Sequence, residues 1–226
     1  MRRIPLLLTS LALALTGACQ QPALAAESVV KTPPAETRAS ESGGLKTAIF
    51  AGGCFWGVEA VFSHTKGVTS AIAGYHGGTE RSAKYSLVSS GVTDHAEAVK
   101  VTYDPDVIRY DQLLRIYFSV ITDPTQLNRQ GPDTGAHYRS AIVPMSAEQN
   151  KVAKAYIAQL KQAGVWDKPI VTKIERAQGF YPAETYHQDF AAKNPRHGYI
   201  VRWDAPKVAA LKRLYPSAYR AEFKRD

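Results

Sequence analysis

The sequence predicts an α+β fold, a two-layer sandwich in which helices cover one face of a sheet. Residues 95–103 divide into two faces with the two-residue period of a strand, whereas residues 106–120 carry apolar residues at helical spacing. Segments of the two kinds follow each other irregularly, and no internal repeat is visible. This irregular order favours a two-layer α+β sandwich over a doubly wound parallel sheet.

The remaining elements follow from the same patterns and from turn residues. Ser146 and Gln149 form a capping-box start for one helix, and Pro216 ends the last one. Residues 123–137 hold two Pro and two Gly and form a long loop, which in a compact domain is usually functional. Strands are expected at 45–50, 68–75, 95–103, 139–143 and 169–175. A first helix is expected to begin at or just after Cys54 and to be ended by Gly67, and further helices are expected at 106–120, 146–163, 182–193 and 205–214, with a short helical or irregular segment at 82–90.

The first 18 residues have the features of an export signal. Arg2 and Arg3 precede a short apolar run that ends in small residues, and this run is too short for a comfortable membrane span. Cys19 then resembles the lipidated first residue of a bacterial lipoprotein, although Thr16 stands where Leu is usual. The competing site is a cut after Ala25, which would release a soluble protein. We expect an exported, periplasmic protein, attached to the membrane if Cys19 is lipidated.

Residues 19–44 are predicted to be a disordered tether. They are rich in Gln, Pro, Ala, Glu, Ser and Gly and contain almost no large apolar side chain, so burial cannot offset the entropy of ordering them. Residues 45–226 are then a single catalytic domain, long enough to bury a sizeable core without disulfides or metals.

The basic composition does not indicate nucleic-acid binding. The chain has a formal net charge of +8 and a sequence pI near 9.4. Basic residues are spread along the chain with only a mild cluster after Lys207, and an exported protein meets little nucleic acid. We interpret the charge as a solvated surface and expect a monomer that binds no nucleic acid.

The cysteine count leaves one thiol in the predicted folded domain. The chain has two cysteines, and because Cys19 is lost or lipidated in either processing scheme, Cys54 is the only thiol of the folded domain. A single cysteine forms no internal disulfide, and the six histidines show no paired spacing. We therefore expect no structural zinc and no other bound metal.

Cys54 lies where a strand is expected to turn into a helix. Free backbone N–H groups and the positive end of the helix dipole favour an anion there, so we expect the thiol to be biased toward thiolate. Phe55 and Trp56 supply an apolar wall beside the sulfur. The alternative is a small buried hydrophobe with only a packing role.

Glu97 shares a strand face with Val99 and Val101, so its carboxyl should point toward the core. Burial disfavours the charged form and raises the pKa of a carboxyl, and a neutral acid can donate a proton in a reaction. The alternative is a glutamate exposed at the end of the strand.

The string Gly53 to Gly57, Gly-Cys-Phe-Trp-Gly, followed by Glu59, resembles the active-site signature of the peptide methionine sulfoxide reductase A family. The resemblance covers 46–215. It implies a ferredoxin-like core with additional peripheral helices, and reduction of methionine S-sulfoxide, free or in oxidised proteins. It also implies attack of Cys54 on the sulfoxide sulfur, which leaves a sulfenic acid. Glu97, in a His-Ala-Glu string, matches the family's acid.

The resemblance assigns further residues to the site. Tyr85 and Tyr138 would hydrogen-bond the sulfoxide oxygen, and Phe55 and Trp56 would hold the substrate's methyl group. Two more positions match the substrate-binding part of the family pattern. These are Asp133, which helps to position water and the substrate backbone, and His187, in a late His-Gln-Asp-Phe string.

The chain departs from the family pattern at three places. Phe190 stands where many relatives carry Tyr, and Thr122 stands where His is common. The cysteines that follow the nucleophile in many relatives are missing, since none lies after Cys54. We expect a single-cysteine enzyme without a bound cofactor, regenerated by an external thiol, either a thioredoxin-like or glutaredoxin-like protein or a small thiol.

Two other classes of function stay open. A cysteine hydrolase or thiol peroxidase could use Cys54, but a hydrolase needs a histidine base, and only His64 is near in sequence. A non-catalytic exported binding domain is the second alternative, and it would keep its ligand after Cys54→Ser.

Overall fold

The computed structural model describes residues 29–225. The predicted export signal, Cys19 and the first part of the predicted tether lie outside the described residues. Within residues 29–225, no helix has the length and apolar character needed to cross a bilayer.

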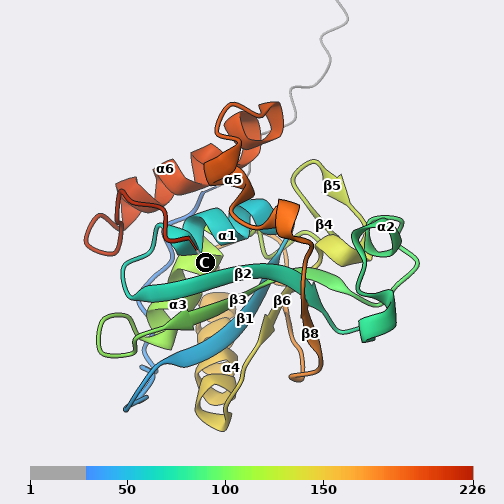
Figure 1. The fold of residues 1–226 in the computed structure, drawn as a ribbon. Coiled ribbons are helices and arrows are strands. Elements are labelled where there is room, and N and C mark those ends of the chain that lie inside the picture. The colour runs from blue at the N-terminus through green and yellow to red at the C-terminus, as the bar shows by residue number, and fades with distance from the viewer. Residues whose placement is uncertain (1–28, 226) are drawn as a thin grey trace, which may run out of the picture.

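A six-stranded sheet in the order β7-β6-β1-β3-β2-β8 forms the centre of the domain (Figure 1). Strands β6, β1, β3 and β2 pair with one another in antiparallel fashion, and β8 adds an antiparallel strand beside β2. Strand β7 is parallel to β6. A helix separates β1 from β2, and further helices separate β3 from β6, which is the connectivity and strand order of a ferredoxin-like core. The predicted α+β two-layer fold with this core is confirmed. The strands are β1 (Lys46–Gly52), β2 (Val68–His76), β3 (Ala96–Tyr103), β6 (Ser140–Val143), β7 (Lys173–Ile174) and β8 (Phe180–Pro182), and β4 (Arg129–Gln130) and β5 (Asp133–Thr134) form a separate hairpin.

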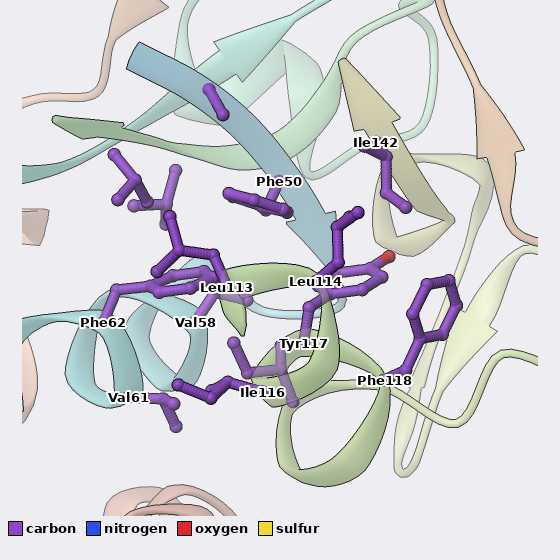
Figure 2. Packing of buried hydrophobic residues seen from close by; sticks show 14 of the residues in the cluster. Phe50, Val58, Val61, Phe62, Leu113, Leu114, Ile116, Tyr117, Phe118 and Ile142 are labelled. Atoms are coloured by element: carbon purple, nitrogen blue, oxygen red, sulfur yellow. The ribbon is translucent and has the colours of Figure 1, made fainter. Parts of the chain in front are cut away.

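Helices pack against one face of this sheet and bury the main core. Phe50 of β1 lies 4.9 Å from Phe62 and 5.5 Å from Tyr117, measured between ring centroids. Figure 2 shows these rings packed with Leu113 and Leu114 between the sheet and its helices. The α-helices are α1 (Phe55–Ser63), α2 (Tyr85–Val88), α3 (Tyr110–Ile116), α4 (Ala147–Gln162), α5 (Phe190–Lys193) and α6 (Ala205–Leu214), with shorter turns η1 (Glu80–Ser82), η3 (Ala136–Tyr138) and η4 (Thr185–His187) and π-helical turns η2 (Tyr117–Ile121) and η5 (Ile200–Asp204).

The helix expected at 182–193 is wrong. Its residues form the end of β8, the turn η4 and the four-residue helix α5. Gln188 explains the change, because its side-chain amide accepts from Ala73 N (3.0 Å) and donates to Ala73 O (2.9 Å), extending the edge of β2. Asp189 then adopts a left-handed backbone conformation, with φ 54°. These tertiary hydrogen bonds outweigh helical propensity. The strand expected at 169–175 is also shorter than predicted, since only Lys173–Ile174 pair in the sheet.

Residues 29–44 are not a disordered tether, contrary to the prediction for 19–44. Thr32 is fully buried, and its hydroxyl lies 2.7 Å from Ser119 Oγ and 2.9 Å from Tyr156 Oη. Further along, Ala39 N donates to Asp111 Oδ1 at 3.0 Å. We call residues 29–44 the strap. The strap has few large apolar side chains, but its backbone and hydroxyl groups satisfy polar groups of α3, η2 and α4, which composition alone does not reveal.

The C-terminal part of the chain lies beside α1. Figure 1 shows α5 and α6 on the same side of the molecule as α1. Tyr219 forms an isolated β-bridge with Thr65, and Arg220 N donates to His64 O at 2.9 Å. The end of η5 lies against the first turn of α1, because Asp204 packs on Gly57.

Candidate active site

Cys54 is the N-cap residue of α1, at the strand-to-helix turn that the sequence predicts. Gly53 has a φ of 91°, and a Cβ there would overlap the side chain of Gln130, so the turn needs glycine. Thr122, one of the departures from the family pattern, donates to Gln130 Oε1 at 2.7 Å. Thr122 thus supports the glutamine that lies under the catalytic turn.

Glu97 faces the nucleophile's helix from β3. Its side chain is buried, and Phe55 N donates to its Oε2 at 3.0 Å, as expected for a residue on the core-facing side of the strand. The pKa of Glu97 is raised to about 8, mainly by burial and further by the charges of Asp133 and Asp204, although the hydrogen bond from Phe55 N lowers it in part. Glu97 is therefore mostly a neutral acid near pH 7.

Tyr85 and Tyr138 reach the same region from α2 and η3. Burial raises the pKa of both phenols, and next in order the charges of Glu97 and Cys54 raise it further. Tyr85 is fixed through its backbone N–H, which donates to Glu184 Oε1 at 2.9 Å. Both phenols stay protonated and can donate hydrogen bonds.

Asp133, on β5, accepts a hydrogen bond from the hydroxyl of Tyr199. Burial raises the pKa of Tyr199, and the charge of Cys54 is the next cause, so this phenol also belongs to the site. Tyr199 is not among the site residues predicted from the sequence. Its only local signal is a tyrosine after Gly198, which does not separate it from the other tyrosines of the chain.

Trp56 is held from several sides. Its ring stacks on Phe190 with centroids 3.7 Å apart and an interplanar angle of 8°. Its indole Nε1 donates to Nδ1 of His187 at 3.2 Å, and the ring of Tyr199 meets it edge-on at 5.8 Å. The indole is thus a fixed apolar wall beside Cys54, and Phe190 keeps the stacking ring but lacks the hydroxyl of the tyrosine that many relatives carry.

His187 is buried under this wall. Its ring centroid lies 5.0 Å from Phe55 and 4.4 Å from Tyr85. Burial lowers the pKa of His187, with a smaller opposing effect of Glu184. His187 is therefore neutral, which leaves Nδ1 free to accept from Trp56. Phe55 itself is buried against Tyr75 and His187, so its ring forms the floor of the site and Trp56 its wall.

The expected bias of Cys54 toward thiolate is wrong for the resting site. Burial raises the pKa of the thiol well above its ordinary value of 9.0, and the charges of Glu97 and Asp204, with a weaker effect of Asp133, raise it further. The hydrogen bond from Trp56 N, which is the helix-terminus effect, lowers the pKa but does not compensate. Asp204 is not among the predicted site residues either, because its local sequence gives no sign that it reaches α1.

A histidine base for Cys54 is not present among the described residues, since none of their histidines hydrogen-bonds the sulfur. His64, the histidine nearest in sequence, contacts Arg220 O at 3.0 Å and stacks on Tyr219. Residues 29–225 also contain no group of three or more His, Cys, Asp or Glu side chains placed to hold a metal ion.

Comparison with known proteins identifies the family. A model of the family described as "Peptide methionine sulfoxide reductase" matches residues 46–218. The chain belongs to the peptide methionine sulfoxide reductase family. A relative from Mesorhizobium japonicum, named peptide methionine sulfoxide reductase MsrA 2, is 55% identical over 176 residues, which cover 78% of this chain and 90% of the relative.

Solved structures of family members have a fold similar to that of this chain. Mxr1 from Saccharomyces cerevisiae in reduced form is 34% identical with a TM-score of 0.62, covering 72% of this chain and 92% of that chain. Methionine sulfoxide reductase A of Corynebacterium diphtheriae is 34% identical with a TM-score of 0.58, covering 69% of this chain and 78% of that chain. This peptide methionine sulfoxide reductase is an oxidoreductase that reduces methionine sulfoxide with a thiol. The hydrolase, thiol peroxidase and binding-domain alternatives gain no support.

Proposed function

We propose that this chain reduces methionine S-sulfoxide, free or in oxidised proteins, with Cys54 as its only redox-active cysteine. The observation that carries the proposal is the facing pair of Cys54 and Glu97, joined through the backbone N–H of Phe55. A sulfur nucleophile and a neutral carboxylic acid are the two groups that removal of an oxygen from sulfur requires.

In the proposed reaction, the Cys54 sulfur attacks the sulfoxide sulfur while Glu97 protonates the sulfoxide oxygen. Oxygen then passes to Cys54. The sulfoxide is reduced by two electrons to the thioether, Cys54 is oxidised to the sulfenic acid, and Glu97 regains a proton from the original thiol. Tyr85 and Tyr138 donate hydrogen bonds to the oxygen as negative charge develops on it.

The substrate's methyl group would lie against the indole of Trp56. The stacked Phe190 and the hydrogen bond to His187 fix this indole before the substrate arrives, so little freedom is lost on binding. Asp133, held by Tyr199, would orient water and the substrate backbone. Phe55 is buried beneath the site and supports it by packing on Tyr75 and His187.

Turnover requires an external thiol, because no cysteine follows Cys54. One thiol attacks the sulfenic acid, releasing water and leaving a mixed disulfide, and a second thiol resolves it to regenerate Cys54 and a disulfide of the reductant. A thioredoxin-like protein, a glutaredoxin-like protein or a small thiol can supply both.

We also propose that the protein is exported to the periplasm, acts as a monomer there, and is attached to a membrane through lipidated Cys19. The basic start, the apolar run and the small residues before Cys19 support this. Labelling cells with a fatty-acid analogue tests it. Label on the wild type but not on Cys19→Ala supports lipidation, and unlabelled protein with Ala26 as its first residue contradicts it.

The deciding experiment is reduction of the two separated sulfoxide epimers with dithiothreitol. We expect turnover of the S epimer by the wild type and none by Cys54→Ser. After one equivalent of substrate without reductant, the mass spectrum should show one added oxygen on Cys54. Activity on neither epimer would contradict the proposed reaction, and an intramolecular crosslink would contradict the single-cysteine cycle.

A further inference from the structure

Glu184 joins three elements that surround the site. It lies between β8 and η4 and is the N-cap residue of η4. Its Oε1 accepts from Tyr85 N, at the start of α2, at 2.9 Å, and its Oε2 accepts from the hydroxyl of Tyr75, on β2, at 2.8 Å. Its main-chain carbonyl accepts from His187 N at 2.8 Å. The two oxygens of one carboxyl group thus link α2 to the sheet.

The sheet end of this link lies directly beside the acid. Tyr75 is fully buried, and it is the register partner of Glu97 in the pairing of β2 with β3. The residue before Glu184 is tied to the same strand, because Ala183 N donates to Ala73 O at 2.9 Å. Glu184 therefore has a fixed place relative to Glu97.

The helix end of the link lies in a segment with little support of its own. Helix α2 has four residues, of which Val88 is buried, and Figure 1 shows it at the periphery of the domain. A helix of one turn is not stable in water by itself, so its place depends on tertiary contacts. The ring of Tyr85 packs on His187 with centroids 4.4 Å apart, whereas the hydrogen bond to Glu184 holds the Tyr85 backbone.

We propose that Glu184 is a positioning residue for Tyr85, because its side chain bridges Tyr75 and Tyr85 N and so sets the distance from the Tyr85 hydroxyl to Glu97. This inference deepens the proposed function and rests on it. The hydroxyl stabilises the sulfoxide oxygen only if it meets that oxygen at hydrogen-bond distance while Glu97 protonates it. Glu184 acts through Tyr85, so its loss slows the reaction of bound substrate more than it weakens substrate binding.

The test is a double-mutant cycle of Glu184→Ala and Tyr85→Phe. It measures the rate of methionine formation from the S epimer in a single turnover, over a range of substrate concentrations. We expect Glu184→Ala to lower the maximal rate about tenfold or more and to change the half-saturating concentration less than about threefold. In the Tyr85→Phe protein, the same change should lower the rate less than about twofold, because the hydroxyl to be positioned is already absent. Equal losses in both backgrounds overturn the proposal.

Two further variants separate placement from charge. Glu184→Gln keeps the reach, since its carbonyl can accept from Tyr85 N and its amide can donate to the Tyr75 oxygen, and its rate should stay within about threefold of the wild type. Glu184→Asp keeps the carboxylate but is one methylene shorter, so it cannot bridge both partners and should resemble Glu184→Ala. A slow Gln variant beside an Asp variant with the wild-type rate overturns the proposal. The matched control is Glu80→Ala, which changes an exposed glutamate of η1 and should keep the wild-type rate.

Amide hydrogen exchange at Tyr85 supplies a second readout that needs no sulfoxide. Exchange of this N–H should be about tenfold faster or more in Glu184→Ala, which removes its acceptor, and unchanged in Glu80→Ala. Circular dichroism checks the fold, and Glu184→Asp takes the place of an Ala variant that does not fold. Equal exchange rates in the wild type and the folded variant overturn the proposal. A wild type inactive on the S epimer contradicts the proposed function instead, and the exchange rates still decide whether Glu184 holds Tyr85.

Discussion

Phe55 N donates a 3.0 Å hydrogen bond to Oε2 of Glu97, so the residue that follows the nucleophile holds the acid in place. The bond joins the first turn of α1 to the middle of the sheet, across the layer boundary of the sandwich. If α1 moved relative to β3, Cys54 and Glu97 would move apart. The reaction therefore depends on how the helix layer packs on the sheet.

Glu97→Gln should lower kcat about 10²-fold or more, because the amide cannot donate the proton. The carboxyl's pKa is about 8 in the folded protein against 4.5 in the unfolded chain. Between these values the unfolded chain is ionised while the folded site is not, so the wild type loses stability as pH rises from 4.5 to 8. The Gln variant should lack this loss and be more stable at pH 8, by up to about 5 kcal/mol. Urea unfolding at pH 5 and pH 8 measures it, and equal pH dependence in both proteins would contradict it.

Phe190→Ala should raise KM about threefold to tenfold with a smaller effect on kcat. The stacked ring holds the indole of Trp56, and an aromatic pair contributes roughly 0.5–1.5 kcal/mol. Phe190→Tyr keeps the ring and is the control, with KM close to that of the wild type. Steady-state kinetics on the S epimer decide the matter, and a loss confined to kcat would refute this role.

Thr32→Val should destabilise the domain by about 1–3 kcal/mol, because it removes the hydrogen bonds of the buried Thr32 hydroxyl with Ser119 Oγ and Tyr156 Oη. Thr37→Val is the matched control, since the Thr37 side chain forms no hydrogen bond with the described residues, and it should change stability by less than about 0.5 kcal/mol. Urea unfolding compares the two, and equal stabilities would mean that the strap does not contribute through Thr32.

Glu175→Gln should destabilise the fold at pH 7 and impair the placement of Tyr138. Glu175 accepts from Arg139 Nε at 2.8 Å, and Arg139 follows Tyr138. Burial alone would raise the pKa of Glu175, but bonds from His76 and Arg139 lower it to about 2. This contribution is present above pH 4.5 and is lost as pH falls toward 2. The stability difference from the wild type should therefore shrink at pH 3. A difference that stays constant with pH would contradict this account.

Strand periodicity placed Glu97 correctly, because a two-residue period assigns each residue to a face whatever covers it. The signature string placed Cys54 at a helix start for a similarly local reason. The helix at 147–162 also follows from local capping and spacing, whereas α1 ends at Ser63, before the predicted end at Gly67. The helix expected at 182–193 failed where Gln188 bonds the edge of β2 instead of continuing a local helix.

Local sequence by itself determined the α+β order of elements, the strand face of Glu97 and the turn that holds Cys54, because neighbouring residues fix periodicity, caps and turns. Only the tertiary structure decided that residues 29–44 pack as a strap, that Tyr199 reaches Asp133, and that Asp204 lies at the first turn of α1. These contacts join segments far apart in the chain. The state of the Cys54 proton depends on the sum of burial and several distant charges, and that sum exists only in the folded protein.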